Sequence, residues 1–440
     1  MSNGVAGKIL NVNLSENKIR EEPLNAEEVK KYIGGKGYAA RLLWDRNPSG
    51  IDPFSPENLI IFATGPLTGT LCPSTRMCIV TKSPLTGTFN DSYVGGHFAH
   101  ELKFAGYDFL IIEGRAEKPV YLWINNDNVE TRDARWLWGK DIFETEEKIK
   151  EKHKDRTIRV ACIGPAGEKL VRYATVNVDL YRQAGRGGIG AVMGSKNLKA
   201  VALRGSKPVE LKDPEKFRLL ALDAYRAIEQ NESLYTMRRW GTGRSVIFSS
   251  DQCLYPTKNY QMTTFEGAEN LSGESMETKL WVKSKACFNC PIHCGHLAVV
   301  KSSDYAGTII EGIEYETTAM LGANCGVDDL AAVAHANMLC DKLGLDTIST
   351  GNVIAFVMEC YEKGILTDED LGGLKLTFGN HKAMNQMILK IAERKGIGNL
   401  LAEGVKVAAQ KIGKGSEKFA MHVKGLELPG WGIRAAPSMG

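Results

Sequence analysis

The chain has no strong excess of charge of either sign and no long hydrophobic run. Its 440 residues include 55 Lys and Arg against 52 Asp and Glu, so no basic excess points to nucleic acid. It contains no apolar stretch of about 18 residues, the length that a membrane-spanning helix needs. The N-terminus lacks a charged segment followed by an apolar core, so no signal peptide is expected. We therefore predict a cytoplasmic protein that binds neither nucleic acid nor membranes.

The chain also lacks the G-x4-GK[ST] order of a P-loop and any Pro- or Ser-rich linker. The first absence argues against an ATP or GTP site of that kind. The second means that a domain boundary has to be placed by a change of periodicity alone.

That change falls near residue 211. Residues 1–210 contain β-branched runs punctuated by glycine, which predict a β-rich domain. Beyond them, apolar residues at three- and four-residue spacing predict helices over 215–229, 328–343, 354–363, 382–394 and 397–411. We predict an α+β protein with a β-rich domain at 1–210, an α-helical domain at 211–417 and the start of a C-terminal helical domain at 418–440.

The β-rich part contains a weak internal repeat. IFATGP at 61–66 is echoed by VACIGP at 160–165. GGHFAHELKFAGYDFLIIEG from Gly95 is echoed by GGIGAVMGSKNLKAVALRG from Gly187, and both copies then reach a Lys-Pro-Val. Chance similarity between Gly-rich segments is the alternative explanation. The repeat predicts two related half-sheets.

Ten cysteines in a cytoplasmic protein are rarely structural disulfides, so a close group of them is a candidate metal site. Cys287, Cys290 and Cys294 form a C-x2-C-x3-C run that brings three soft thiolates within reach of one centre. A [4Fe–4S] cluster would take its fourth ligand from a distant cysteine or a non-protein group. Zinc with His293 or His296 as the fourth ligand is the competing interpretation, and the spacing alone does not decide between them.

Glycine-rich turns occur at 34–37, 94–96 and 185–196. Such turns let backbone N–H groups approach an anion, and we expect a phosphate-bearing cofactor other than NAD or ATP. Arg76 precedes a predicted strand and Arg186 lies inside the third turn, so each is a candidate bidentate ligand for that anion. Either arginine alone would be read as an ordinary surface residue.

Asp341 and Asp346 frame the end of the predicted helix at 328–343, where Gly344 is suited to stop it. Negative charge at a helix C-terminus is unfavourable by roughly 0.3–1 kcal/mol, so these carboxylates find donors elsewhere or pair with Lys342. The N–H edge of a pterin would suit them. Upstream, the Glu-rich segment at 311–318 offers a candidate general base if one carboxyl is buried, although solvated glutamates are commoner.

In combination these segments resemble the aldehyde:ferredoxin oxidoreductase family. The match rests on Arg76, the turn at 90–96, GRGGIGAVMGSKNLKA from Gly185, the C-x2-C-x3-C run and D-x-x-G-L-D from Asp341, and it covers essentially the whole chain. The resemblance implies aldehyde oxidation to carboxylic acids at a tungsten (or molybdenum) bis-molybdopterin centre. It also implies a [4Fe–4S] cluster that passes electrons to ferredoxin or an electron-transfer subunit, Mg²⁺ bridging the pterin phosphates, and half-sheets related by a pseudo-twofold axis.

The same resemblance implies roles for individual residues. The cluster ligands would be Cys287, Cys290 and Cys294. Cofactor contacts would come from Arg76, Asn90, Ser92, Gly95, Gly96, Arg186, Gly187, Gly188, Asp341, Gly344, Leu345 and Asp346. Glu316 is the best match to the family's active-site glutamate, which relays a proton as water adds to the aldehyde carbon, and Glu314 is its rival.

This sequence also departs from the family. Relatives continue beyond residue 440 with the fourth cluster cysteine, the second pterin loop and an active-site histidine, so we expect a truncated chain. Ala332 stands where some relatives carry the glutamate of a subunit-bridging E-x-x-H metal site, so we predict no such metal, and a homodimer is plausible rather than implied. The alternatives are an acid or aryl-thioester reductase of the same family in a larger complex, and a noncatalytic zinc-binding module.

Overall fold

The structure is a computed structural model that describes residues 3–434. The chain divides into two compact units. The first comprises Met1–Asn231, Ala286–Pro291 and Lys342–Gly344, and the second comprises Glu232–Lys285, Ile292–Asp341 and Leu345–Gly440. Within residues 3–434, no helix is both long enough and apolar enough to cross a bilayer.

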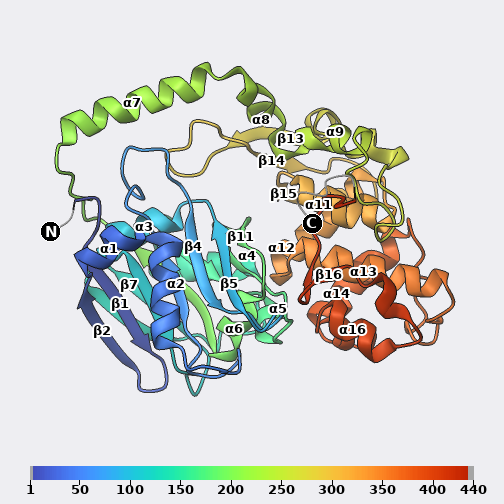
Figure 1. Cartoon of the computed structure of the whole chain (residues 1–440), viewed down its shortest axis with the longest axis horizontal. Coiled ribbons are helices and arrows are strands. Elements are labelled where there is room, and N and C mark those ends of the chain that lie inside the picture. The colour runs from blue at the N-terminus through green and yellow to red at the C-terminus, as the bar shows by residue number, and fades with distance from the viewer. Residues whose placement is uncertain (1–2, 435–440) are drawn as a thin grey trace. The chain divides into compact units, whose positions relative to one another are not determined.

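The first unit contains two six-stranded sheets, drawn in blue to green in Figure 1. The strand orders are β2-β1-β6-β3-β4-β5 and β11-β10-β9-β12-β7-β8. The first sheet is built from β1 (Lys8–Asn13), β2 (Lys18–Pro23), β3 (Ile60–Ala63), β4 (Met77–Lys82), β5 (Phe89–Val94) and β6 (Phe109–Glu113). The second is built from β7 (Val120–Asn125), β8 (Asn128–Asp133), β9 (Arg159–Cys162), β10 (Val176–Val178), β11 (Arg182–Ala184) and β12 (Leu198–Arg204).

The two sheets have the same topology. Each has one parallel pair, β1 with β6 and β7 with β12, and its other neighbouring strands are antiparallel. Read in reverse, the second sheet has the order β8-β7-β12-β9-β10-β11. Each of its strands then corresponds to the strand of the first sheet whose number is lower by six. The helix before the last strand also corresponds, α3 (Phe98–Phe104) with α6 (Ile189–Ser195). This confirms the prediction of two related half-sheets, with IFATGP on β3 and VACIGP on β9.

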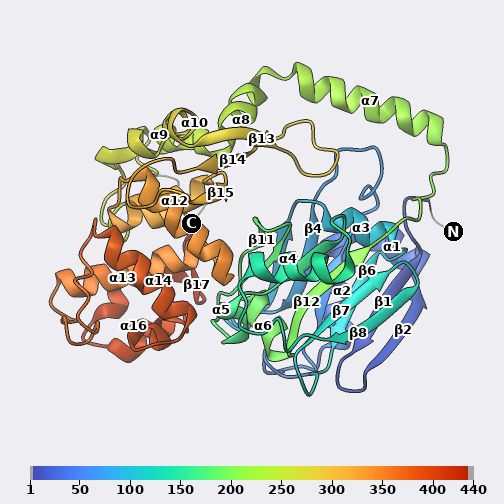
Figure 2. The same cartoon turned by 180° about the vertical axis from the view of Figure 1, so that it is seen from behind.

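The sheets and helices of this unit pack in layers. One apolar core includes residues from both sheets and from α3 and α6, and each of these helices contacts strands of the opposite sheet. On the outer faces, α1 (Ala26–Tyr32) and α2 (Gly35–Arg46) cover the first sheet and α4 (Ile142–His153) covers the second (Figures 1 and 2). Ile60–Ala63 is buried on both faces, as expected of a central strand between two helical layers. The short helix α5 is Pro165–Glu168, and α7 (Pro214–Gln230) also belongs to this unit.

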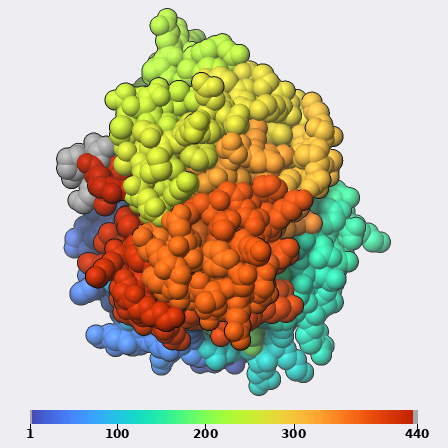
Figure 3. Space-filling view, turned by 90° about the vertical axis from the view of Figure 1, so that its right-hand side faces the viewer, coloured from blue at the N-terminus to red at the C-terminus, as the bar shows by residue number. Residues whose placement is uncertain are grey.

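The second unit is mainly helical. Its α-helices are α8 (Tyr235–Trp240), α9 (Ser245–Asp251), α10 (Gly273–Lys279), α11 (Tyr315–Thr317), α12 (Leu330–Leu343), α13 (Thr347–Glu362), α14 (His381–Ala392), α15 (Ile397–Leu401) and α16 (Val405–Ile412). A π-helical turn follows α11 at Thr318–Gly322. Two small sheets complete the unit, β13 (Trp281–Lys285), β14 (Gly295–Val299) and β15 (Ile309–Glu311), and the pair β16 (His422–Val423) and β17 (Leu426–Glu427). In Figure 3 its yellow and orange segments lie side by side on one face.

Two predicted helices differ from those observed. The stretch at 397–411 is two helices, because Gly404 (φ +88°) breaks it before α16. Helix α13 begins at Thr347 and not at residue 354, since buried polar residues in its first turns interrupt the apolar period. The small sheets were not predicted, because β13 is largely exposed and has no apolar alternation.

Candidate functional site

Two of the predicted cofactor segments meet in the first unit. Asn90 Nδ2 donates a hydrogen bond to the Arg186 carbonyl at 3.2 Å, and the Arg186 N–H donates to Ser92 Oγ at 3.2 Å. Ser83 Oγ donates to the Gly187 carbonyl at 2.7 Å. Side chains on and beside β5 therefore fix the turn that leads into α6.

The glycines of this turn are required by close packing. Gly187 and Gly188 have φ of +79° and +81°, a region that favours glycine. A Cβ on Gly187 would lie 1.8 Å from Asn90 Oδ1, and one on Gly188 would lie 2.0 Å from the Arg172 carbonyl oxygen. The turn can approach its neighbours only without side chains.

The spacing of Gly185, Gly187 and Gly190 is that of a dinucleotide-binding turn. Such a turn joins a strand and a helix within a parallel βαβ unit. Within residues 3–434, β11 pairs with β10 alone, antiparallel, and β12 lies elsewhere in the sheet. The turn therefore lacks the parallel βαβ unit of a dinucleotide site, and a cofactor other than NAD stays a prediction.

The segment that contains Cys287 and Cys290 is hydrogen-bonded to the glycine turn at 94–96. The Phe288 N–H donates to the Gly96 carbonyl at 3.2 Å, and Asn289 Nδ2 donates to the Thr70 carbonyl at 2.9 Å. A Cβ on Gly95 would lie 2.9 Å from Cys287 Sγ, so glycine there makes room for the thiol. The structure thus joins the predicted metal ligands to the predicted Gly95-Gly96 turn.

Aromatic contacts hold the same segment. The rings of Phe288 and His100 stack with centroids 3.7 Å apart, and the Tyr225 hydroxyl donates to the Asn289 carbonyl at 2.8 Å. Burial lowers the pKa of His100 to about 3, so its ring is neutral in this stack. The Cys290 N–H closes a turn on the Cys287 carbonyl at 3.2 Å.

The donor set fits an iron–sulfur cluster. Cys287, Cys290 and Cys294 are free of disulfides and half-buried. Cys287 and Cys290 belong to the first unit and Cys294 to the second. Across the described part of the chain, no three His, Cys, Asp or Glu side chains are already grouped to hold a metal. Cysteine thiolates are the ligands that iron–sulfur clusters take, so these three cysteines stay the predicted ligands.

The predicted helix stop at Gly344 is confirmed. Helix α12 ends at Leu343, Gly344 has φ of +75°, and the Leu345 N–H donates to the Cys340 carbonyl at 2.9 Å. This is the hydrogen bond of a Schellman C-cap. The Gly344 carbonyl accepts from the Thr175 N–H at 2.9 Å, which fixes residues 342–344 on the first unit.

The two aspartates of this loop have different environments. Asp341 is buried and accepts from Asn337 Nδ2 at 2.7 Å, while Lys342 pairs with Asp141 at 3.5 Å. Asp346 is the N-cap of α13 and accepts from the Ile348 N–H at 2.9 Å. The expectation that Asp346 opposes a helix dipole was therefore wrong, because its charge lies at a helix N-terminus, where it is favourable.

The two candidate catalytic glutamates are also distinguished. Glu314 is exposed and accepts a hydrogen bond from Thr242 Oγ1. Glu316 is half-buried in α11, and its Oε2 accepts from the Gly430 N–H at 2.6 Å. The π-helical turn that follows is a feature often found at functional sites. Of the two, Glu316 is in the more enclosed setting.

Arg76 lies directly before β4 and is exposed, and it has no hydrogen bond or ion pair within residues 3–434. Its role as a ligand for an anion stays a prediction.

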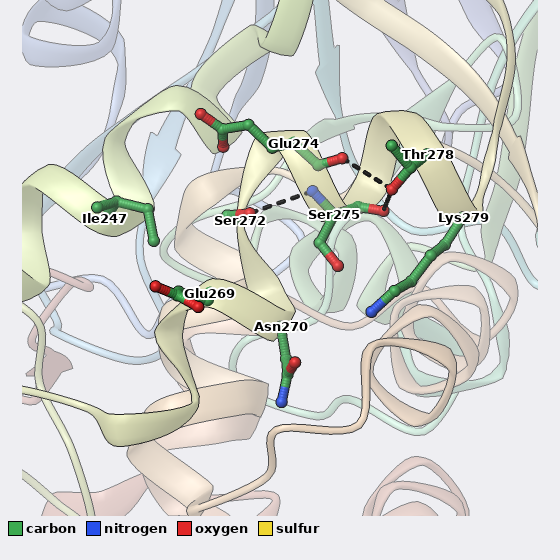
Figure 4. A pocket seen from close by; sticks show the side chains of 8 residues that line it. All are labelled: Ile247, Glu269, Asn270, Ser272, Glu274, Ser275, Thr278 and Lys279. Carbon is green, nitrogen blue, oxygen red and sulfur yellow. Dashed lines mark hydrogen bonds between the residues drawn. The ribbon is translucent and has the colours of Figure 1, made fainter.

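The second unit has a hollow of about 520 Å³, and Figure 4 shows the side chains that line it. It is lined by Ile247, Glu269, Asn270, Ser272, Glu274, Ser275, Thr278 and Lys279. None of the predicted site residues is among them. Its polar groups make hydrogen bonds within α10 and at its start. Ser272 Oγ accepts from the Ser275 N–H at 3.1 Å, and the Thr278 hydroxyl donates to the Glu274 carbonyl at 3.0 Å. We assign it no catalytic role.

Several site residues could not be found from the sequence. Asn289 and His100 hold the cysteine segment, and Gly430 and Thr242 contact the candidate glutamates. Each acts on a partner far away in the chain, so no local pattern marks it.

The comparison with known families is decisive. The N-terminal domain of aldehyde ferredoxin oxidoreductase matches residues 9–205, and domains 2 and 3 of that enzyme match residues 220–440. The chain belongs to the aldehyde ferredoxin oxidoreductase family. Membership of this oxidoreductase family implies a tungsten–pterin cofactor and an iron–sulfur cluster.

Individual proteins that are similar to this chain support the same family assignment. The chain is 46% identical to a tungsten-containing aldehyde ferredoxin oxidoreductase of Pyrococcus horikoshii, over 99% of this chain and 72% of that protein. It is 38% identical to a protein of Pyrococcus furiosus named aliphatic sulfonate oxidoreductase, WOR-like subunit, over 98% and 71% of the two chains. Among solved structures it resembles the active-site complex of benzoyl coenzyme A reductase with 1,5-dienoyl-CoA, with a TM-score of 0.85 and 34% identity over 98% of this chain and 67% of that one.

Proposed function

We propose that this protein oxidises aldehydes to carboxylic acids at a tungsten (or molybdenum) bis-molybdopterin centre and passes the electrons through a [4Fe–4S] cluster to ferredoxin. The reaction consumes an aldehyde and water and releases a carboxylic acid, two protons and two electrons. The observation that carries the proposal is the 46% identity along 99% of the chain to an enzyme of that name. The seating of the cysteine segment on Gly95-Gly96 supports it.

The residues that would hold each group follow from their positions. Cys287, Cys290 and Cys294 would bind the iron–sulfur cluster. The segments 90–96 and 186–188, already hydrogen-bonded to each other, would hold the pterin phosphates and their Mg²⁺. Asp341 to Asp346 would contact one pterin, and Arg76 would contribute its cationic side chain to binding the anionic cofactor. The bound metal–pterin centre supplies the two-electron redox chemistry.

The chain's own contribution to the chemistry centres on Glu316. Its carboxylate accepts a hydrogen bond from the Gly430 N–H, and we assign to it acceptance of the substrate water's proton. The rings of Tyr315 and Trp431 lie 4.7 Å apart beside it, and Tyr255 is fully buried against Tyr315. This aromatic surface excludes water and strengthens the electrostatic effect of each neighbouring hydrogen bond.

The test compares two glutamine variants of the anaerobically purified protein. Glu316→Gln should lower aldehyde-dependent reduction of ferredoxin by at least ~100-fold, the usual range for removal of a general base. Glu314→Gln, its matched control, should stay within about threefold of wild type, because that carboxyl is exposed and acts outside the enclosed site. Equal losses in both variants would contradict the assignment.

A second candidate is reduction of an acid or aryl thioester by the same cofactor. The observation that favours it is the 34% identity and TM-score of 0.85 to the benzoyl coenzyme A reductase complex. Reduced ferredoxin supplied with an aryl thioester separates the two functions. Turnover of the thioester without any aldehyde oxidation would replace the first proposal with the second.

A further inference from the structure

One peptide group in the second unit is hydrogen-bonded to both Tyr260 and Glu316. We propose that Tyr260 positions and polarises the peptide between Pro429 and Gly430, and that this peptide holds the carboxylate of Glu316 in its charged form. The proposal rests on the proposed function, in which Glu316 accepts a proton. It makes Tyr260 a positioning residue, because it acts on the glutamate through the backbone.

The geometry gives both ends of the peptide a partner. Its N–H, that of Gly430, donates to Glu316 Oε2 at 2.6 Å. Its carbonyl, that of Pro429, accepts from the Tyr260 hydroxyl at 2.6 Å and from the Trp431 N–H at 2.8 Å. The Tyr260 hydroxyl is also 2.8 Å from the Leu428 carbonyl, so its single proton is shared between two neighbouring carbonyls. The bond to Glu316 is short, as expected of a charge-assisted hydrogen bond.

Glycine at position 430 is what permits this approach. A Cβ there would lie 3.1 Å from Glu316 Oε2 and 2.5 Å from the Ala319 Cβ. The Tyr315 hydroxyl donates to the Gly430 carbonyl at 2.6 Å, which fixes the next peptide as well. The loop is therefore held against α11 from two sides, with its backbone directed at the carboxylate.

The backbone that presents Tyr260 is unusual. Lys258, Asn259 and Tyr260 have φ of +49°, +53° and +60°, three successive non-glycine residues in the left-handed region. Such a run is unfavourable and persists only where the surroundings enforce it, as often happens near functional sites. Asn259 enforces it, since its buried Nδ2 donates to Glu359 Oε2 at 2.6 Å and to the Phe419 carbonyl at 2.9 Å. The strained turn fixes the position from which Tyr260 reaches the loop.

The expected electrostatic effect follows from cooperativity. A donor at a peptide carbonyl polarises the peptide and strengthens the hydrogen bond made by its N–H. Tyr255 and Tyr315 face Glu316, and burial raises the pKa of both, so they stay neutral. Arg434 is a charged group beside the same loop, and its guanidinium donates to the Tyr260 carbonyl. Glu314, on the same segment, is engaged by Thr242. His296 faces Glu314, and burial lowers its pKa. Loss of the Tyr260 hydroxyl should therefore make Glu316 easier to protonate.

The experiment is an infrared titration of the carboxylate band that disappears in Glu316→Gln. Tyr260→Phe keeps the ring and removes the hydroxyl, and should raise the midpoint of that titration by roughly half a pH unit. Tyr255→Phe is the matched control, because it removes a buried hydroxyl from the same aromatic cluster without touching the 429–430 peptide. An unchanged midpoint in Tyr260→Phe, or an equal shift in Tyr255→Phe, would overturn the proposal.

Gly430→Ala provides a second route if Tyr260→Phe fails to fold. It displaces the N–H from Glu316 without altering any ionisable group, and should raise the same midpoint. The infrared measurement does not depend on activity, so it is separable from the catalytic assignment. Wild-type aldehyde oxidation by the Glu316→Gln variant would refute the catalytic assignment of Glu316 alone. An inactive Glu316→Gln variant, together with an unshifted midpoint in both loop variants, would refute the present inference alone.

Discussion

The side chain of Asn90 donates to the backbone carbonyl of Arg186, 3.2 Å away, and so ties the edge strand β5 of one half-sheet to the turn that leads into α6 of the other. The two residues belong to different copies of the internal repeat. Residues predicted separately to line pterin phosphates are thus joined by the protein itself.

Gly187→Ala tests this contact. An alanine Cβ would lie 1.8 Å from Asn90 Oδ1 at a φ of +79°, so we expect a loss of about 3 kcal/mol or more in the free energy of unfolding. Gly87→Ala is the control, with φ of +72° and nothing within 4 Å of the added Cβ, and should cost about 1 kcal/mol. Urea unfolding of both measures the difference. In an Asn90→Ala background the two costs should converge, and persistence of the gap would contradict the proposed clash.

The sequence predicted this region unevenly, for physical reasons. The β-rich character of residues 1–210 was found because buried β-branched runs, such as those in β3 and β6, are a local signal. The Gly344 stop was found because a left-handed C-cap depends on one residue. The role of Asp346 was misread because helix α13 starts directly after the loop, and its buried polar first turns conceal the apolar period.

The contacts of the candidate site escaped prediction for a different reason. Gly430 lies 114 residues from Glu316, and Asn289 lies 219 residues from Thr70. No pattern in the neighbouring residues could reveal such pairs. The cysteine spacing and the glycine turns were visible as separate motifs, but that Gly95 and Gly96 form the seat of Cys287 follows only from the fold.

The cysteines offer a direct test by metal content. Replacing Cys287 or Cys290 by Ser should remove most of the iron. Each substitution removes a soft thiolate ligand that the neighbouring residues do not supply. Cys253→Ser, an exposed free cysteine outside the motif, should leave the iron content of the anaerobically purified protein unchanged. Equal iron in all three variants would show that the motif does not bind the cluster.

Asp346 can be tested for a role beyond helix capping. Asp346→Ala removes the N-cap and should cost about 1–2 kcal/mol in the free energy of unfolding, and Asp346→Asn should cost roughly half as much because Asn is also a good N-cap. If the carboxylate also contacts a pterin, both variants should lose tungsten to a similar extent. Tungsten retained in the Asp346→Asn variant would mean that Asp346 acts only as a helix N-cap.

Lys196 should give the protein a characteristic pH dependence. It is buried, its Nζ donates to the Pro56 carbonyl at 2.8 Å and the Gly114 carbonyl at 3.2 Å, and burial lowers its pKa to about 7. The unfolded chain, with a lysine pKa near ~10.4, then binds more protons than the folded one between these values. Stability therefore rises with pH across that window, by at most about 1.4 kcal/mol per pH unit.

Lys196→Met removes this contribution, so the comparison isolates it from buried thiols and tyrosines that titrate in the same range. Urea unfolding at about pH 7.5 and about pH 9 should show wild type gaining stability relative to Lys196→Met. A constant difference between the two proteins at both pH values would mean that Lys196 stays charged in the folded state.

The central claim is that this chain carries the cofactors of its family, and metal analysis of the anaerobically purified protein tests it most directly. We predict tungsten, or molybdenum in its place, together with about four irons per chain, the content of one [4Fe–4S] cluster. Zinc as the only bound metal, with no tungsten, molybdenum or iron, would contradict the proposed oxidoreductase and favour a noncatalytic zinc protein.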